Sequence, residues 1–292
     1  LKPEIMDMEE KSLAQHFETH FRVALAHTRE LMEQAHRLRY EVYCKEFQFE
    51  REEDCPGGME RDDYDSHSLH GLVIHRSTQT AAGCFRLIRP PQHNLALPLP
   101  FEKYCGHSLY GGPKHPDNLP RTNLCEVSRV AVASIFRRRQ GESESRFGRL
   151  SSVDFTEIEM RVFPLLSVSL FAAGAALMVL ARQSNLFVMM EMRLARLLQR
   201  SGLNFTQVGH PLDYHGIRAA FFITIDQVLT GMKGEMRDMY NFIYRDLEAE
   251  VAHARLNLSR PDLGIRQRPS GIYGEMTGLH YFDDGENPKD LS

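Results

Sequence analysis

Residues 162–181 contain no charged side chain, and this run limits what the chain can fold into. An uncharged stretch of about 20 residues is either a membrane-spanning helix or a helix enclosed by other elements of a folded domain. The run includes a proline, two serines and a glycine and is rich in alanine, so its hydrophobicity is moderate. We therefore predict a buried helix at roughly residues 157–183, and no transmembrane span.

The segments around this helix alternate between strand and helix patterns. Strands are predicted at residues 67–76, 81–88, 124–133, 186–190, 205–208 and 218–225. An amphipathic helix is predicted at 191–200. After residue 124 the order is strand, helix, strand, helix, strand, strand. This order predicts an α/β fold whose mixed central sheet has parallel pairing in its middle.

The two ends of the chain differ from this pattern. Residues 9–50 carry apolar and charged groups at helical spacing, and residues 226–258 read as a charged helix. The remainder contains several prolines and glycines, so we expect an irregular arm there. The first residues, Leu1-Lys2-Pro3-Glu4, show no apolar signal-peptide core.

Charge and cysteine content narrow the class of protein. The chain has 35 basic and 39 acidic residues and a net charge of -4, which does not suit a nucleic-acid partner. Its five cysteines include no CxxC pair, and Cys105-Gly106-His107 is the only tight Cys/His pair. We expect reduced thiols in a cytoplasmic protein and no metal site.

Four local patterns follow one another along the chain. They are Leu38-Arg39-Tyr40-Glu41-Val42-Tyr43, then Asp62-Asp63-Tyr64-Asp65, then Gly83-Cys84-Phe85-Arg86-Leu87-Ile88 with Pro100-Phe101-Glu102, and finally Cys125-Glu126-Val127-Ser128-Arg129-Val130-Ala131-Val132. Each pattern alone is common. Their order, and their positions on or beside the predicted strands, make the set more specific.

Together these patterns resemble the autoinducer (acyl-homoserine-lactone) synthases and the related N-acyl amino acid synthases, over roughly residues 37–225. A finer resemblance is to the acyltransferase group associated with PEP-CTERM/exosortase systems. The resemblance implies a GNAT-like acyltransferase domain at residues 1–230, followed by a C-terminal helical extension and irregular arm at 231–292.

The family resemblance also implies the substrates. The acyl donor is an acyl carrier protein thioester or an acyl-CoA, and no cofactor is tightly bound. Its phosphopantetheine arm lies where two neighbouring parallel strands splay apart, here 124–133 and 186–190. The acceptor is a small amine, either an amino acid or S-adenosylmethionine. Autoinducer synthases have a tryptophan after the first motif, whereas this chain has none, and Phe47 or Phe49 is the nearest substitute.

Glu126 is the candidate general base, because the amine of an amino acid is mostly protonated at neutral pH and must lose a proton before it attacks a thioester. The family motif places its acid at this position. The alternative is a buried ion pair between Glu126 and Arg129 or Arg86, and the two roles are compatible.

Arginines and aspartates of the motifs are expected to form one polar network near the acceptor. The network comprises Arg39, Asp62, Asp65, Arg86, Glu126 and Arg129. Arg129, a second catalytic candidate, and Arg86 can hold the acceptor's carboxylate in a bidentate fork. Alternatively, they can order the acidic loop through Asp62 and Asp65. Without the resemblance, the two aspartates would read as a solvated acidic turn.

Further contacts with substrate are expected from the backbone and from aromatic rings. Backbone N–H groups from Val127 to Val130 are the candidate donors to the developing oxyanion. Tyr43 and Phe101 are expected as apolar walls of the substrate site, although lone aromatic residues are more often plain core.

An arginine cluster follows the strand that carries Glu126. Arg137, Arg138, Arg139 and Gly141 could receive the phosphate of the pantetheine arm or contact an acidic carrier protein. The alternative is a solvated charged loop.

Besides a peripheral membrane protein, a possibility that rests on the uncharged run at 162–181, three functions remain open from the sequence. The first is an N-acyltransferase that moves a fatty acyl group from a carrier-protein or CoA thioester to an amino-acid-like amine. The second is an acyl-homoserine-lactone synthase that acylates S-adenosylmethionine. The third is a non-catalytic relative that binds a lipid or a carrier protein.

Overall fold

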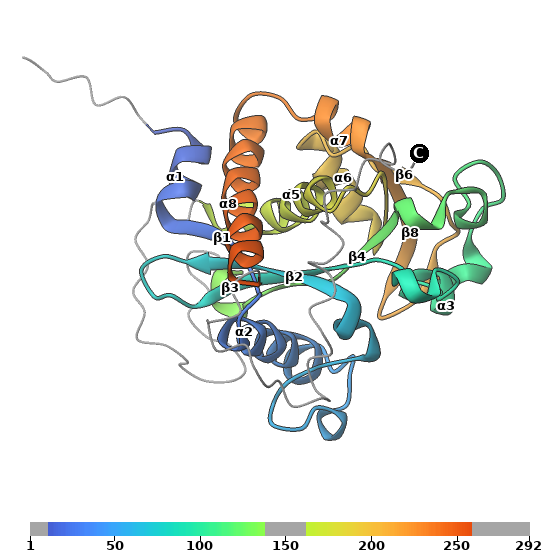
Figure 1. Cartoon of the computed structure of the whole chain (residues 1–292), viewed down its shortest axis with the longest axis horizontal. Coiled ribbons are helices and arrows are strands. Elements are labelled where there is room, and N and C mark those ends of the chain that lie inside the picture. The colour runs from blue at the N-terminus through green and yellow to red at the C-terminus, as the bar shows by residue number, and fades with distance from the viewer. Residues whose placement is uncertain (1–10, 138–161, 259–292) are drawn as a thin grey trace, which may run out of the picture.

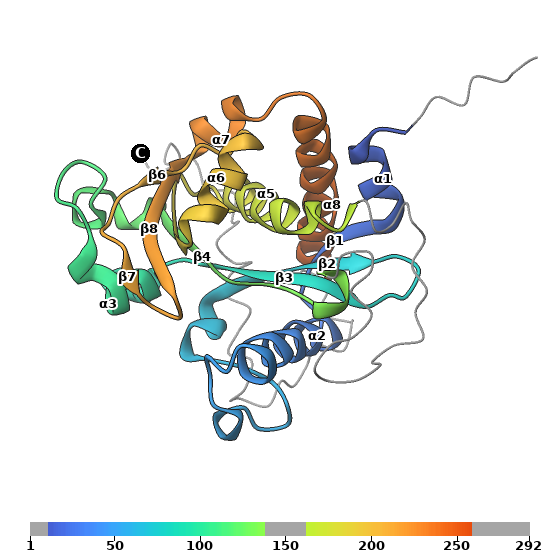
Figure 2. The ribbon, with the colours of Figure 1, turned by 180° about the vertical axis from the view of Figure 1, so that it is seen from behind.

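The computed structural model describes residues 11–137 and 162–258. A central sheet crosses the molecule, with α5, α6, α7 and α8 on one side and α2 on the other (Figure 1). The view from behind shows the same layers, with α3 beside the end of the sheet that carries β7 (Figure 2). The predicted GNAT-like α/β fold with a mixed central sheet and a C-terminal helix is confirmed.

The elements follow the chain in an order that alternates after β4. The α-helices are α1 (Leu13–His20), α2 (Arg29–Arg39), α3 (Pro100–Cys105), α5 (Leu165–Leu180), α6 (Met192–Arg200), α7 (Ile225–Gly231) and α8 (Glu235–Leu258). The strands are β1 (Phe21–Leu25), β2 (Ser68–His75), β3 (Ala81–Ile88), β4 (Leu124–Val132), β5 (Asn185–Met190), β6 (Thr206–Gln207), β7 (Leu212–Asp213) and β8 (Ile217–Thr224). Three short helices matter for the site: the π-helix η1 (Tyr40–Glu46) and the 3₁₀ turns η3 (Asp63–His67) and η7 (Arg121–Asn123).

The strands lie in the order β1-β2-β3-β4-β5-β8-β6, and β7 pairs with β8. Neighbours pair antiparallel except β4 and β5, which are parallel. This parallel pair follows from the chain between them, because a parallel connection needs a long crossover and α5 is part of it.

Helix α5 is the buried helix predicted from the uncharged run. Its residues from Leu166 to Met178 are nearly all buried, in a core shared with β3, β4 and α8. Gly174 lets it approach β4, because a Cβ atom there would lie 2.8 Å from Cγ2 of Val127. Among the described helices, none is both long enough and apolar enough to span a membrane.

The N-terminal region differs from its prediction. Strand β1 interrupts the expected helical stretch, pairing Phe21–Leu25 with β2. Its five residues are too few to show a period. Phe21, Val23 and Leu25 are buried in the core shared with α8, and Ala24 is buried on the side of α2, so tertiary packing decides their conformation.

The C-terminal helix is present and belongs to the same core as the sheet. Ile243 and Leu247 of α8 are fully buried with residues of α5 and β1. The domain division at residue 231 stays a prediction, and the expected arm at 259–292 lies outside the described residues.

Candidate active site

Strands β4 and β5 run side by side for only part of their length. The paired positions are Leu124 with Asn185, Cys125 with Leu186, and Glu126 with Phe187. Beyond them β4 continues along β3 to Val132, and β5 continues along β8 to Met190. The two strands therefore separate just after Glu126. This is the place where the family resemblance predicts the phosphopantetheine arm of the acyl donor.

Glu126 is buried at this point. Its Oε2 accepts a hydrogen bond of 3.0 Å from the backbone N–H of Phe101. Burial raises the pKa of Glu126 to about 8, because the charged carboxylate loses its hydration. In the described part of the chain no ion pair within 4 Å joins Glu126 to Arg86 or Arg129, so the alternative of a buried ion pair is not realised.

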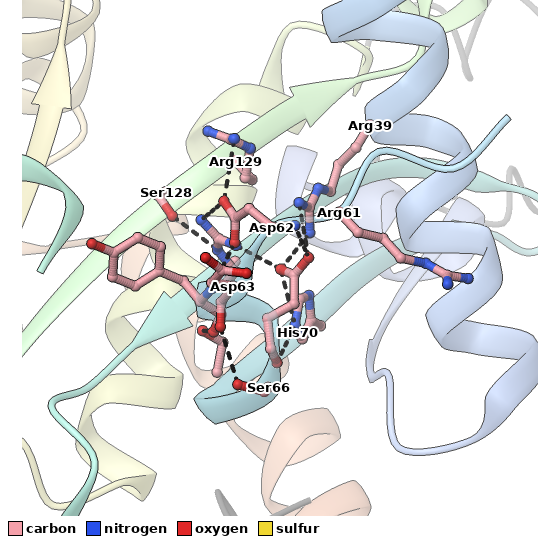
Figure 3. Close-up of polar contacts among 12 residues, drawn as sticks. Arg39, Arg61, Asp62, Asp63, Ser66, His70, Ser128 and Arg129 are labelled. Atoms are coloured by element: carbon pink, nitrogen blue, oxygen red, sulfur yellow. Dashed lines mark hydrogen bonds and ion pairs between the residues drawn. The ribbon is translucent and has the colours of Figure 1, made fainter. Parts of the chain in front are cut away.

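Arg39 and Arg86 are fully buried, and each binds Asp65. Figure 3 shows the polar contacts of this region, with Arg39, Asp62 and Arg129 labelled. Arg39 donates to both oxygens of Asp65, at 2.7 and 3.1 Å, and also to Glu60. Arg86 donates to Asp65 at 2.6 Å and to both oxygens of Asp62. Burial alone would raise the pKa of Asp65, but the two guanidinium groups lower it well below its usual range.

A bulge in β4 directs Arg129 towards two of these carboxylates, Glu60 and Asp62. Cys84 pairs with Ala131, and Arg86 pairs with Ser128. One residue of β3 therefore lies opposite two residues of β4, which is a β-bulge. Arg129 sits in this bulge with φ at 49°, a conformation that non-glycine residues rarely adopt.

The bulge directs the Arg129 guanidinium into a group of three carboxylates. Its Nη2 lies 3.1 Å from Oε1 of Glu50, 3.1 Å from Oε1 of Glu60 and 3.2 Å from Oδ2 of Asp62. Glu60 is almost fully buried, whereas Glu50 and Asp62 are partly exposed. The exposed side of the cluster is therefore acidic.

We call these seven residues the ionic cluster. Its members are Arg39, Glu50, Glu60, Asp62, Asp65, Arg86 and Arg129. Three guanidinium groups face four carboxylates, giving a formal charge of +3 - 4 = -1. Each arginine is bound by carboxylates of the chain itself, so the cluster orders the acidic loop, one of the two roles considered for Arg86 and Arg129. Binding of an acceptor carboxylate stays a prediction.

Sequence reasoning missed Glu50 and Glu60. Both are members of the ionic cluster, yet they stand in a stretch with several other acidic residues, and the spacing does not show which side chains turn inward. Glu60 stands two residues before Asp62, and this closeness to the second motif is the one signal that could have singled it out.

His36 and His70 pack beside Asp65 in an arrangement that could suggest a metal site, since the three ligand atoms lie within 4.8 Å of one another. Burial lowers the pKa of His36 to about 3 and that of His70 to about 4, so both rings are neutral. However, Asp65 is already bound by two guanidinium groups, whose positive charge would repel a cation. The geometry therefore favours a structural role for these histidines, and the expectation of no metal stays a prediction.

The expected aromatic and backbone contacts are placed as follows. The Tyr43 hydroxyl donates 3.0 Å to the carbonyl of Val130, and its ring lies under the Arg129 guanidinium. The Phe101 ring stacks on Phe187 with centroids 4.5 Å apart. The Val127 side chain points to α5 and belongs to the core, so only its backbone could serve a substrate.

Aromatic residues gather on the β7–β8 turn and the segments facing it. His215 packs on Phe49, with ring centroids 4.8 Å apart, and Tyr214 stacks on Tyr104 of α3 at 6.2 Å. Phe49 in turn lies against Phe47. Phe49 thus joins the turn to the segment after η1, and which of the two phenylalanines replaces the absent tryptophan stays a prediction.

Arg137 contacts other residues of the chain, and its role in binding phosphate or a carrier protein stays a prediction. It forms an ion pair with Glu46 of η1 and donates 2.9 Å to the carbonyl of Val132. The other members of the predicted carrier-binding cluster, Arg138, Arg139 and Gly141, lie outside the described residues.

Comparisons with known proteins identify the kind of domain that carries these residues. Residues 38–144 match the family model described as an acetyltransferase (GNAT) domain. This segment contains the first motif, the ionic cluster and Glu126. The chain carries a GNAT acyltransferase domain. No curated protein matches the chain.

Solved structures are similar to the chain over most of its length, and the first one named below shares its fold. The CoA-dependent acyl-homoserine lactone synthase BjaI, solved with SAM and isopentyl-CoA, has a TM-score of 0.50 at 18% identity, over 81% of this chain and 99% of that chain. The synthase TofI, solved with an inhibitor and MTA, has a TM-score of 0.49 at 19% identity, over 73% and 95%. FeeM, an N-acyl amino acid synthase from uncultured soil microbes, has a TM-score of 0.44 at 11% identity, over 73% and 94%.

The match to the GNAT family model confirms the predicted GNAT domain and acyl transfer as the class of reaction. The identities are below one fifth, so they carry no information on donor or acceptor. The roles of the individual site residues and the finer resemblance to the PEP-CTERM/exosortase group stay predictions.

Proposed function

We propose that this GNAT domain transfers a fatty acyl group from a carrier-protein or CoA thioester to the amine of an amino-acid-like acceptor. The observation that carries the proposal is Glu126, a buried carboxylate with a pKa of about 8 at the point where β4 and β5 part. A group that titrates near neutral pH is suited to exchange protons with an amine.

The reaction needs one proton transfer before the acyl group moves. Glu126 takes a proton from the acceptor's ammonium, and the free amine then attacks the thioester carbonyl. The carbon–nitrogen bond forms, the carbon–sulfur bond breaks, and the second proton that the nitrogen loses passes to the sulfur, which leaves as the thiol of the pantetheine arm. Glu126 releases the first proton to solvent. The products are an amide and the free carrier thiol. Backbone N–H groups between Val127 and Val130 are the proposed donors to the oxyanion.

The acceptor is proposed to approach from the acidic side of the ionic cluster. Glu50 and Asp62 are partly exposed there and attract an ammonium group. The same charge would suit S-adenosylmethionine, which carries an ammonium and a sulfonium, so lactone synthesis is the second candidate. An acyl carrier protein and a cytoplasmic location belong to the proposal, and the five free cysteines fit a reducing compartment.

Mass spectrometry of lipid extracts tests the proposal. Cells expressing the chain are compared with cells expressing Glu126→Gln, which keeps the size of the side chain but cannot take the proton. Glu53→Gln is the matched control, because that side chain is 62% exposed. We expect a new N-acyl amino acid with the unchanged chain and the control, and its loss with Glu126→Gln.

The identity of the product separates the candidates. An acyl-homoserine lactone instead of an N-acyl amino acid would favour the second function. The purified protein, supplied with acyl carrier protein or CoA thioesters and followed by thiol release, then identifies the donor. Equal product from the Glu126→Gln strain would rule out Glu126 as the base, and no acylated amine from any strain or donor would favour the non-catalytic relative.

A further inference from the structure

A set of polar contacts, here called the brace, joins Arg121 and Glu102 to the backbone of Leu95, Leu97 and Leu99. It surrounds the first turn of α3 and lies outside the ionic cluster. Arg121, in η7, donates from Nη1 to Oε1 of Glu102 at 2.5 Å. Its Nε and Nη2 donate to the carbonyls of Leu95 and Leu97, at 3.0 and 2.7 Å. All three bonds leave one planar guanidinium, so they fix the segment before α3 and α3 itself in one geometry.

Glu102 passes this constraint on to the start of the helix. Its Oε2 accepts the backbone N–H of Leu99 at 2.7 Å, while Oε1 is held by Arg121. Leu99 is the residue before α3, so the two bonds fix the first turn from both sides. Phe101 lies between Leu99 and Glu102, and its N–H points at Oε2 of Glu126.

The stacking of Phe101 on Phe187 completes the arrangement. The two rings are nearly parallel, with an interplanar angle of 13°, and Phe187 is the β5 partner of Glu126. The first turn of α3 is thereby fixed to the strands that carry the carboxylate. Within the described residues, the Phe101 N–H is the one hydrogen bond to Glu126, so Oε1 remains available to a substrate.

We infer that Arg121 and Glu102 are positioning residues for Glu126: they hold the Phe101 N–H on one carboxylate oxygen and so aim the other at the acceptor amine. This inference rests on the proposed function for the role of Glu126, but not for the geometry. A hydrogen bond to the charged form of a carboxylate favours that form, so the brace keeps Glu126 easier to ionise than burial alone would allow.

Other groups also act on Glu126, and the test must separate them from the brace. The ionisable groups around it are Arg86 on β3, Cys125 and Arg129 on β4, Glu102 and Cys105 on α3, Tyr64 on η3, and Tyr214 after β7. Replacing Glu102 would remove a nearby negative charge as well as a contact. Arg121 is therefore the better residue to change.

The experiment compares Arg121→Met with Arg121→Lys in the full chain. Lysine keeps the positive charge but cannot make the three bonds of the guanidinium, so it isolates geometry from charge. Lys103→Gln is the control, an exposed charge on the same helix. Carbon-13 NMR of carboxyl-labelled glutamate, with the Glu126 signal assigned through Glu126→Gln, measures the titration midpoint without turnover, and circular dichroism checks that each variant is folded.

We expect both Arg121 variants to raise the titration midpoint of Glu126 by about half a pH unit or more, because the N–H bond to its charged form is weakened. The acidic limb of the kcat/KM profile should move by the same amount, and kcat should fall about tenfold as the base loses its alignment. The control should leave the midpoint and the profile unchanged.

Two results would overturn the inference. An unchanged midpoint in both Arg121 variants would show that the brace does not act on Glu126. A shift with methionine but none with lysine would show an effect of charge through space and no positioning. If the midpoint moves as expected while no acceptor is acylated by any form of the protein, the positioning holds and the proposed function fails.

Discussion

Arg39 on α2 binds Asp65 through both terminal nitrogens, with Nη1 and Nη2 at 2.7 and 3.1 Å from the two carboxylate oxygens. Only 1% of Arg39 is exposed, and its Nε donates to Glu60. The pair fixes α2, on its own side of the sheet in Figure 1, to the turn η3 that precedes β2. The ionic cluster is thus part of the fold as well as of the candidate site.

Arg39→Met should therefore destabilise the protein strongly. It leaves Asp65 and Glu60 short of a buried partner, and breaking a buried pair in this way lowers the free energy of unfolding by about 3–5 kcal/mol. Urea denaturation followed by circular dichroism measures the change. Arg29→Met, on the same helix with a side chain 78% exposed, should change it by less than about 0.5 kcal/mol. Equal stability of the two variants would contradict the structural role of Arg39.

Glu126→Gln should stabilise the protein more at pH 8 than at pH 5.5. The pKa of Glu126 is about 8 in the folded protein and near its ordinary value in the unfolded chain. Between these values the folded state binds one more proton than the unfolded state, so stability falls as the pH rises, by up to about 1.4 kcal/mol per pH unit. This fall ends above pH 8 and is absent in the glutamine variant.

Denaturation of both proteins at pH 5.5 and pH 8 checks this expectation. The free-energy difference between glutamine variant and parent should grow with pH, and contributions from other titrating groups cancel in that difference. If the difference is the same at both pH values, Glu126 does not keep its proton in the folded protein.

The sequence predicts the sheet better than it predicts the site. Strands β2, β3, β4 and β5 fall within a residue or so of their expected ranges, because each is an apolar run bounded by turns. Strand β1 was hidden in a helical pattern, since its five residues owe their conformation to β2 and α8.

Within the site, what could be predicted was the set of motif residues and not their partners. The motifs bring Arg39, Asp65 and Arg86 together as expected, and they leave Glu126 outside the ion pairs. Apart from its closeness to Asp62, Glu60 could not be foreseen, because nothing else local distinguishes a buried glutamate from a solvated one. Nor could the bulge at Arg129, because a positive φ depends on the register of β4 with β3.

The pH dependence of the reaction should follow Glu126. A base that must be ionised becomes active as the pH rises, so kcat/KM should rise about tenfold per pH unit below pH 8 and level off near that value. The rate falls again once the acceptor no longer carries the ammonium that binds. A profile measured with the identified donor and acceptor checks this, and a limb centred near pH 4.5 instead would contradict the raised pKa.

Tyr43→Phe should weaken the bulge without removing the ring under Arg129. The variant loses one hydrogen bond, from the hydroxyl to the carbonyl of Val130, next to Arg129. We expect a loss of about 0.5–1.5 kcal/mol in the free energy of unfolding. Burial raises the pKa of Tyr43 to about 12, so the hydroxyl keeps its proton and the difference should be constant from pH 6 to pH 9. Tyr104→Phe, with a side chain 47% exposed, is the control. If both variants lose equally little stability while acylation is also unchanged, the hydroxyl of Tyr43 does not hold the bulge in place.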